Sequence, residues 1–392
     1  MRSTAIPVVL PVVRAGVVLA QSAGRMRRWI GLLALTGLLL AAASAHGGVT
    51  YTVRALGNLG DDIDTRARAL NDSGQVVGWS RTSSRITHAF LWDAATGMQD
   101  LGALLPEGTE SKAVGINNSG QVVGHWWGSD FVAHAFLYDP ATGMGNLPGL
   151  VAGGWSYAYA INDAGQITGE ALPADIASRG HAVLWDPATG LRDLGTLGGN
   201  ESQARAVNNH GQVVGLARTA IGESHAFLWN SVTGMRDLGT LGTGAVSVAE
   251  GVNDLGQVVG YSETAGYSGC HHAFLWDPVT GIKDLGAFGL YRSHACGIND
   301  AGQIIGWAAS ATDHGPYLWF LYDGTTVLDV RDLVAAEVRS MVGSPNDINN
   351  LGQVVGNSPT YLMTLVPEPG TLMMLGASLA AFGLGRLRRR RR

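Results

Sequence analysis

Apolar and polar positions follow a pattern that repeats every 45 to 50 residues along most of the chain. Its most regular part is an Asn-rich turn, then Gly-Gln, then an apolar pair, first seen at 71–78 as Asn-Asp-Ser-Gly-Gln-Val-Val-Gly. A fixed period of this length indicates a repeat architecture. The glycine of the Gly-Gln step occurs seven times, at Gly74, Gly120, Gly165, Gly211, Gly256, Gly302 and Gly352.

One complete unit contains four short segments with the alternation of β-strands. Segments 202–207 and 212–215 flank the turn at 208–211, where Asn and Gly can adopt positive φ angles. Segments 225–229 and 235–239 flank a second turn. In 225–229 (His-Ala-Phe-Leu-Trp), Ala and Leu point one way, whereas Phe and Trp point the other. A sheet that is apolar on both faces must lie between two neighbours, as the blades of a β-propeller do.

The two ends of the repeat region complement each other. The third strand has five near-identical copies, and altered copies at 318–322 and 360–365 fill the sixth and seventh places. A weak fourth strand of the sixth unit is expected at Asp332 and Leu333. The last unit lacks a fourth strand, whereas 53–60 has the sequence of a spare one. We therefore predict an all-β fold over 46–366, a propeller of seven four-stranded blades closed by the N-terminal strand.

An open β-solenoid is the alternative architecture for a repeat of this length. It would leave both end strands unpaired, and it would not explain why the two ends of the repeat region complement each other.

Residues 1–45 have the features of a secretory signal peptide. A positively charged stretch precedes an apolar run at 29–43, and a small-residue cleavage motif follows at 43–45. The alternative, a transmembrane anchor, is disfavoured because the run is short. Translation could start at Met1 or at Met26.

Residues 367–392 contain Pro367, Glu368 and Pro369, an apolar stretch at 371–385 and a tail of six arginines. The three features, in this order, resemble the PEP-CTERM sorting signal of Gram-negative bacteria. The resemblance implies export, transient anchoring in the inner membrane through 371–385, and processing by an exosortase near the Pro-Glu-Pro motif. The arginines would stay cytoplasmic. A plain tail anchor is the alternative, although a helix over the apolar stretch would span only about 22 Å.

His-Ala-Phe triplets and Gly-Gln-Val-Val-Gly segments alternate at constant spacing over roughly 55–365. This combination resembles the HAF family of extracellular repeats. The resemblance implies an exported bacterial protein of the cell surface or extracellular matrix, and it implies no particular chemistry.

Charge is distributed unevenly. The chain has 26 basic and 31 acidic residues, of which 46–366 hold 15 and 30, a net charge near −15. An acidic body of this kind argues against nucleic acid and anionic membrane surfaces as partners.

The recurring histidines do not indicate a metal site, because copies that occur once per blade lie too far apart to share one ion. We expect each of them, and each Gln of the Gly-Gln step, to satisfy backbone groups. The Asn-rich turns lack the pattern of an EF-hand, and Asx-turn chemistry accounts for them. No metal or other cofactor is therefore assigned. The recurring histidines are His88, His134, His181, His225 and His272.

The two cysteines, Cys270 and Cys296, lie among His271, His272 and His294. Their spacing does not fit a zinc site, which needs four ligands within tetrahedral reach. A disulfide between Cys270 and Cys296 and a pair of free thiols both remain open. The chain contains no nucleophile elbow, P-loop or His-Glu-x-x-His segment, and no catalytic residue is assigned.

Function in a repeat protein tends to lie where the copies differ. One variable set comprises the innermost-strand positions Arg66, Arg68, Lys112, Val114, Tyr157, Tyr159, Gln203, Arg205, Val248, Glu250, His294 and Cys296. Another is the loop that carries Trp126 and Trp127, which could stack on a sugar or a protein surface or could only cover the blade edge.

These features favour a non-catalytic structural or binding module that engages exopolysaccharide or surface proteins. The alternative is a propeller hydrolase or lyase that acts on extracellular glycans. A channel cluster of acids, or of His with an acid, would favour the enzyme.

Overall fold

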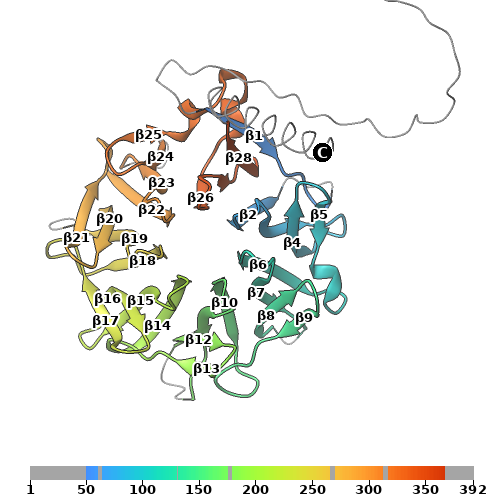
Figure 1. Cartoon of the computed structure of the whole chain (residues 1–392). Helices are drawn as coiled ribbons and strands as arrows, with labels where there is room; N and C mark the ends of the chain where they lie inside the picture. Colours follow the sequence, from blue (N-terminus) through green and yellow to red (C-terminus); the bar gives the residue numbers. More distant parts are fainter. Residues whose placement is uncertain are drawn as a thin grey trace, which may run out of the picture. The chain divides into compact units, whose positions relative to one another are not determined.

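The structure, a computed structural model, describes residues 50–60, 64–129, 131–174, 179–264, 270–311 and 317–366. Seven four-stranded antiparallel sheets are arranged as the blades of a β-propeller (Figure 1). The fold predicted from the repeat is therefore confirmed. The helices of the described residues are three short 3₁₀ segments, and none of these is long or apolar enough to cross a membrane.

The first six blades each follow the chain outward from the centre of the ring. Blade 1 comprises β2 (Thr65–Leu70), β3 (Val76–Arg81), β4 (Thr87–Asp93) and β5 (Gly97–Asp100). Blade 2 comprises β6 (Glu110–Ile116), β7 (Val122–Trp127), β8 (Ala133–Asp139) and β9 (Gly143–Asn146). Blade 3 comprises β10 (Ser156–Ile161), β11 (Ile167–Ala171), β12 (His181–Asp186) and β13 (Gly190–Asp193).

The next three blades have the same order. Blade 4 comprises β14 (Gly198–Val207), β15 (Val213–Thr219), β16 (Ser224–Asn230) and β17 (Gly234–Gly239). Blade 5 comprises β18 (Ser247–Val252), β19 (Val258–Glu263), β20 (His271–Asp277) and β21 (Gly281–Gly286). Blade 6 comprises β22 (Arg292–Ile298), β23 (Ile304–Ala309), β24 (Tyr317–Tyr322) and β25 (Val327–Asp329).

Blade 7 is built from both ends of the propeller. Its strands are β26 (Pro345–Ile348), β27 (Val354–Gly356), β28 (Tyr361–Leu365) and, outermost, β1 (Tyr51–Ala55). β1 pairs antiparallel with β28, so the N-terminal strand supplies the missing fourth strand. The predicted closure is confirmed, and an open solenoid is excluded.

Two strand positions differ from the prediction. The closing strand ends at Ala55 and does not continue to residue 60, because Leu56 turns into the core between blades 7 and 1 and Gly57 adopts a φ of 81°. The fourth strand of blade 6 is β25, whereas Asp332 and Leu333 lie in a 3₁₀ helix, η2 (Val330–Leu333). The Asp329 carboxylate starts this helix by accepting a hydrogen bond from the backbone N–H of Arg331. The other 3₁₀ segments are η1 (Gly102–Leu104) and η3 (Ala336–Met341).

The third strand of each regular blade is apolar on both faces, as the sequence predicts. In β16, Phe227 and Trp229 pack toward blade 3, whereas Ala226 and Leu228 pack toward blade 5. The hydrophobic core is thus divided among the contacts between adjacent blades, and each blade is stabilised by its neighbours.

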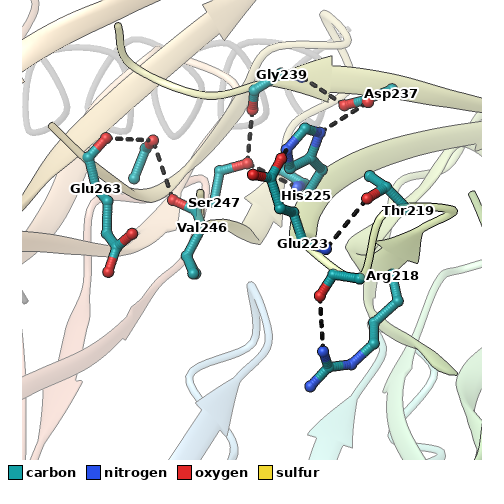
Figure 2. A network of polar contacts seen from close by, with 12 residues as sticks. Arg218, Thr219, Glu223, His225, Asp237, Gly239, Val246, Ser247 and Glu263 are labelled. Carbon is teal, nitrogen blue, oxygen red and sulfur yellow. Dashed lines mark hydrogen bonds and ion pairs between the residues drawn. The ribbon is translucent and has the colours of Figure 1, made fainter. Parts of the chain in front are cut away.

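A polar network joins neighbouring blades beside this apolar contact (Figure 2). Nδ1 of His225 lies 2.8 Å from the carboxylate of Asp237, on the next strand of the same blade. The hydroxyl of Ser247, in blade 5, donates to the Gly239 carbonyl at 2.6 Å and accepts from the Ala226 N–H at 2.8 Å. The equivalent His–Asp pairs are His88–Asp100, His181–Asp193 and His272–Asp284.

The Asn-rich turns form a closed ring at one end of the propeller. The side-chain amide of each turn's first Asn donates to the backbone carbonyl of the equivalent Asn in the next blade, over 2.9–3.1 Å. Asn349 donates to Asn71, so the cycle closes across the two ends of the chain. Because every member is buried, this cycle replaces solvent hydrogen bonds at seven adjacent turns. Its members are Asn71, Asn117, Asn162, Asn208, Asn253, Asn299 and Asn349.

Candidate functional site

A β-bulge in every innermost strand shapes the centre of the propeller. In β14, for example, Ala204 pairs with Gly215 and Ala206 pairs with Val214, so Arg205 is left without a partner in the ladder. A bulge of this kind redirects the side chain of the extra residue. The seven bulged residues are Arg68, Val114, Tyr159, Arg205, Glu250, Cys296 and Asn346.

These bulged side chains line a central cavity of about 500 Å³. The innermost strands that surround it lie at the centre of the ring (Figure 1). Five apolar residues separate this cavity from a smaller one of about 180 Å³, which the Asn-rich turns line. The apolar residues, which border both cavities, are Ile116, Ile161, Val207, Val252 and Ile298. The volume of the larger cavity is in the range of small-ligand sites.

A continuous chain of polar contacts runs along one side of the cavity. The hydroxyl of Tyr159 donates to Glu170 at 2.5 Å and accepts from the side-chain amide of Gln203 at 3.3 Å. The side-chain carbonyl of Gln203 accepts from Nε of Arg205 at 2.9 Å, and Nη1 of Arg205 donates to Glu250. Four neighbouring innermost-strand side chains are therefore held in one arrangement.

Glu250 also contacts a histidine from the next blade. Nε2 of His294 lies 3.6 Å from Oε1 of Glu250, and it has no hydrogen-bond partner among the described residues. Burial raises the pKa of Glu250, although Arg205 and Arg68 oppose this increase. Burial lowers the pKa of His294 to about 3, so its imidazole is neutral near pH 7. A carboxyl with a raised pKa beside a neutral imidazole is an arrangement able to transfer protons.

Two further side chains of this cavity belong to blades 6 and 7. Burial raises the pKa of the Cys296 thiol to about 12, so Cys296 is a thiol and not a thiolate near pH 7. Burial also raises the pKa of Asp347 to about 6, although this carboxylate accepts hydrogen bonds from the backbone N–H groups of Leu70 and Ile348.

Aromatic side chains gather on blades 2 and 3, toward the end of the channel away from the Asn-rich turns. The ring of Tyr157 lies 6.2 Å from Trp127, 5.6 Å from Trp155 and 6.2 Å from Tyr159, with which it is nearly parallel. The ammonium of Lys112 lies 5.3 Å from the Trp127 ring. We call Trp127, Trp155 and Tyr157 the aromatic group. Each of the three is partly exposed, and Tyr159 connects the group to the cavity.

The structure separates the two tryptophans that the sequence brings together. Trp127 belongs to the aromatic group. Trp126 points to the other side of β7, where its indole N–H donates to Asn146 at 2.9 Å and its ring packs on His134.

Four of the five recurring histidines have a carboxylate as their structural partner and not the backbone group expected from the sequence, whereas the fifth, His134, packs on the Trp126 ring. The signal was present, since each His of the four pairs precedes its Asp by 12 residues. The Gln of the Gly-Gln step accepts from the turn Asn, as Gln212 does from Asn208 at 2.7 Å. Asx-turn geometry is confirmed in these turns, where the side-chain carbonyl of Asn208 accepts from two backbone N–H groups.

The remaining sequence candidates are placed as follows. Cys270 and Cys296 are free thiols, and the Cys270 thiol donates to the Tyr291 carbonyl. Within the described ranges, no group of three or more His, Cys, Asp or Glu side chains is placed to hold a metal ion. The signal peptide, the sorting motif of Pro367, Glu368 and Pro369, and the apolar stretch 371–385 lie outside the described residues.

Sequence reasoning identified most of the polar side chains of the cavity wall and missed Asn346 and Asp347, both in blade 7. Eight of the twelve variable innermost-strand positions line the cavity. Asp347 was overlooked because alternation does not place it there. A signal existed, since the other six repeats have only Ala or Gly at this position, namely Ala69, Gly115, Ala160, Ala206, Gly251 and Gly297.

Comparison with known proteins concerns the C-terminus and the fold. Residues 365–391 match the model of the PEP-CTERM protein-sorting motif, which implies processing by an exosortase and export to the cell surface of a Gram-negative bacterium. No curated protein matches the chain by sequence.

Solved structures with a similar fold are distant in sequence. The β-propeller domain of the Trilobed protease from Pyrococcus furiosus is 10% identical, with a TM-score of 0.48, over 77% of this chain and 94% of that one. Acylaminoacyl peptidase from Pyrococcus horikoshii is 11% identical, with a TM-score of 0.48, over 80% of this chain and 54% of that one. TolB from Acinetobacter baumannii is 10% identical, with a TM-score of 0.42, over 75% of this chain and 64% of that one. At these identities the similarity concerns the fold alone.

Proposed function

We propose that this chain is an exported HAF-type repeat protein whose propeller binds extracellular glycans without cleaving them. In this proposal the signal peptide directs export, 371–385 anchors the chain transiently in the inner membrane, and an exosortase processes the Pro-Glu-Pro motif. The mature protein is then held at the cell surface or in the extracellular matrix. Its partners there are exopolysaccharides.

One observation carries the glycan proposal. The aromatic group is partly exposed and leads, through Tyr159, into a cavity large enough for a small ligand. Aromatic rings offer flat apolar faces beside polar edges, which suits the C–H faces and hydroxyl edges of a sugar. The outer surface of the propeller carries isolated exposed apolar residues such as Val232 and Val279, and such residues need no binding partner.

The test is binding of the full-length chain, in mild detergent, to a glycan array and to isolated exopolysaccharide. We expect saturable binding, and Trp127→Ala should weaken it by about 10-fold or more, because a ring of the aromatic group is lost. Trp126→Ala is the matched comparison, since its ring packs on His134 and its indole donates to Asn146. It should change the unfolding temperature more than the affinity. Absence of glycan binding would leave a structural role or a protein partner.

A glycan hydrolase or lyase is the second candidate function. It is favoured by Glu250 and His294, the combination of an acid and a neutral imidazole in the channel. If the protein is such an enzyme, incubation with exopolysaccharide should release new reducing ends, and Glu250→Gln should abolish the release while keeping the side chain's size. Intact polysaccharide after prolonged incubation with the wild-type protein would exclude this candidate.

A further inference from the structure

We propose that the central cavity binds the carboxylate of an acidic sugar, with the guanidinium of Arg68 as the principal contact. The inference rests on the proposed glycan binding and adds a substrate class to it: polysaccharides that contain uronic acids. It concerns the cavity and not the aromatic group. The aromatic group would bind neutral and acidic sugars alike.

The central cavity is less negative than the propeller as a whole. Residues 46–366 carry a net charge near −15. The charged side chains that line the cavity, in contrast, are two cations and two carboxylates, so their formal charges balance. Arg205 is paired with Glu250, and two backbone N–H groups donate to the Asp347 carboxylate, so Arg68 is the cation of the wall that can attract an anion. These charged residues are Arg68, Arg205, Glu250 and Asp347.

Arg68 is the cation best placed to receive a ligand. Arg205 is engaged by Glu250 and Gln203, and Arg66 lies 3.6 Å from Asp64. The guanidinium of Arg68 is exposed to the cavity and forms no hydrogen bond or ion pair with any described residue. Its forked donors match the two oxygens of a carboxylate.

The backbone around Arg68 is held by side chains that occur in blade 7 alone. Oδ1 of Asn357 accepts from the N–H of Ala67 at 2.9 Å, and Nδ2 of Asn346 donates to the Ala67 carbonyl at 2.8 Å. Oδ2 of Asp347 accepts from the N–H of Leu70 at 3.1 Å. The corresponding positions of the other six repeats carry neither Asn nor Asp. These three polar side chains therefore fix the chain on both sides of Arg68 and leave its guanidinium unpaired, as expected for a preorganised site.

Aromatic rings near Arg68 could contact the sugar ring that carries the carboxylate. The Tyr157 and Tyr159 rings are stacked at 6.2 Å, and they extend from the aromatic group into the cavity. Tyr159 is held by Glu170 and Gln203, so its ring position is set before a ligand arrives. A chain that stacks on these rings would bring a sugar carboxylate into the same cavity as Arg68.

The test compares acidic and neutral oligosaccharides of equal length on the full-length chain, by calorimetry. Oligogalacturonate and oligoglucuronate are the acidic probes, their neutral galactose and glucose counterparts are the controls, and inorganic phosphate is a separate arm. We expect the dissociation constants of the acidic probes to be lower than those of the neutral ones by about 10-fold or more. Arg68→Gln should remove this preference and leave the binding of neutral oligosaccharides unchanged.

A matched control removes an arginine elsewhere. Arg192 lies on the outermost strand of blade 3, where its guanidinium packs 4.9 Å from the Trp229 ring, so Arg192→Gln should retain the preference for acidic probes. Equal binding of acidic and neutral oligosaccharides would overturn this inference and leave the glycan proposal intact. Absence of binding to any oligosaccharide would overturn both. Phosphate that competes as well as the uronates would show a general anion site and would overturn the assignment to acidic sugars. An unfolding temperature of Arg68→Gln equal to wild type shows that the fold is retained.

Discussion

Replacing Gly215 by alanine is expected to destabilise the propeller by about 3 kcal/mol or more, since overpacking against backbone is rarely relieved locally. A Cβ at this position would lie 1.9 Å from the carbonyl oxygen of Gln203 in the adjacent innermost strand. The conflict is with backbone, so the strand must move. Because Gln203 lies next to the Arg205 bulge, we also expect glycan binding to weaken. Urea unfolding measures the first effect, and calorimetry measures the second.

The control for this substitution is Gly145→Ala, in the outermost strand of blade 2. The nearest atom to a Cβ there is the Leu137 carbonyl oxygen at 3.9 Å, which is ordinary contact. Its stability should stay within about 1 kcal/mol of wild type. Equal unfolding midpoints for Gly215→Ala and wild type would show that the strand tolerates a side chain at this position, and the expected conflict with the Gln203 backbone would be wrong.

Replacing Asn208 by alanine is expected to cost about 2–4 kcal/mol, because buried donors and acceptors lose their partners. The side-chain carbonyl of Asn208 accepts from the backbone N–H groups of His210 and Gln212. Its amide donates to the Gln212 side chain and to the Asn253 carbonyl in the next blade. Alanine removes all four bonds and interrupts the ring of turns. The measurement is the thermal unfolding midpoint.

His210→Ala is the matched control for Asn208→Ala, because it changes an exposed side chain in the same turn. Its stability should stay within about 0.5 kcal/mol of wild type. If Asn208→Ala unfolds at the temperature of this control, the closed ring of turn asparagines does not contribute to stability as its geometry implies.

Both substitutions affect recurring positions that the sequence repeat alone identifies. The seven Gly-Gln steps predicted tight turns, and all seven glycines adopt positive φ angles, as Gly211 does at 71°. The Phe and Trp of the third strand predicted packing between blades, as Phe227 and Trp229 show. These patterns are local, and each occurs in several repeats. A secondary-structure assignment that is ambiguous in one copy is therefore supported by the equivalent copies.

The candidate site was predictable only as a set of positions. Gln203, Arg205, Glu250 and His294 were recognised as variable members of innermost strands, and the structure places all four in the cavity wall. Their contacts were not predictable. Arg205 meets Glu250 across 45 residues of sequence, and Asn357 holds the backbone next to Arg68 across 290 residues. Such contacts depend on how adjacent blades are rotated and staggered, which no local pattern encodes.

The sequence by itself determined the number of blades, their four-strand construction and the closure of the ring by an N-terminal strand. It could do so because hydrophobic alternation and turn chemistry act over a few residues and recur in every unit. Only the tertiary structure decided which side chains face the cavity together, that Asp347 joins them, and that Arg68 remains unpaired. The physical reason is the bulge in each innermost strand, which redirects one side chain per blade toward the centre of the ring. In blade 4 it lies beside Gly215 of the next strand, where the backbones approach too closely for a Cβ.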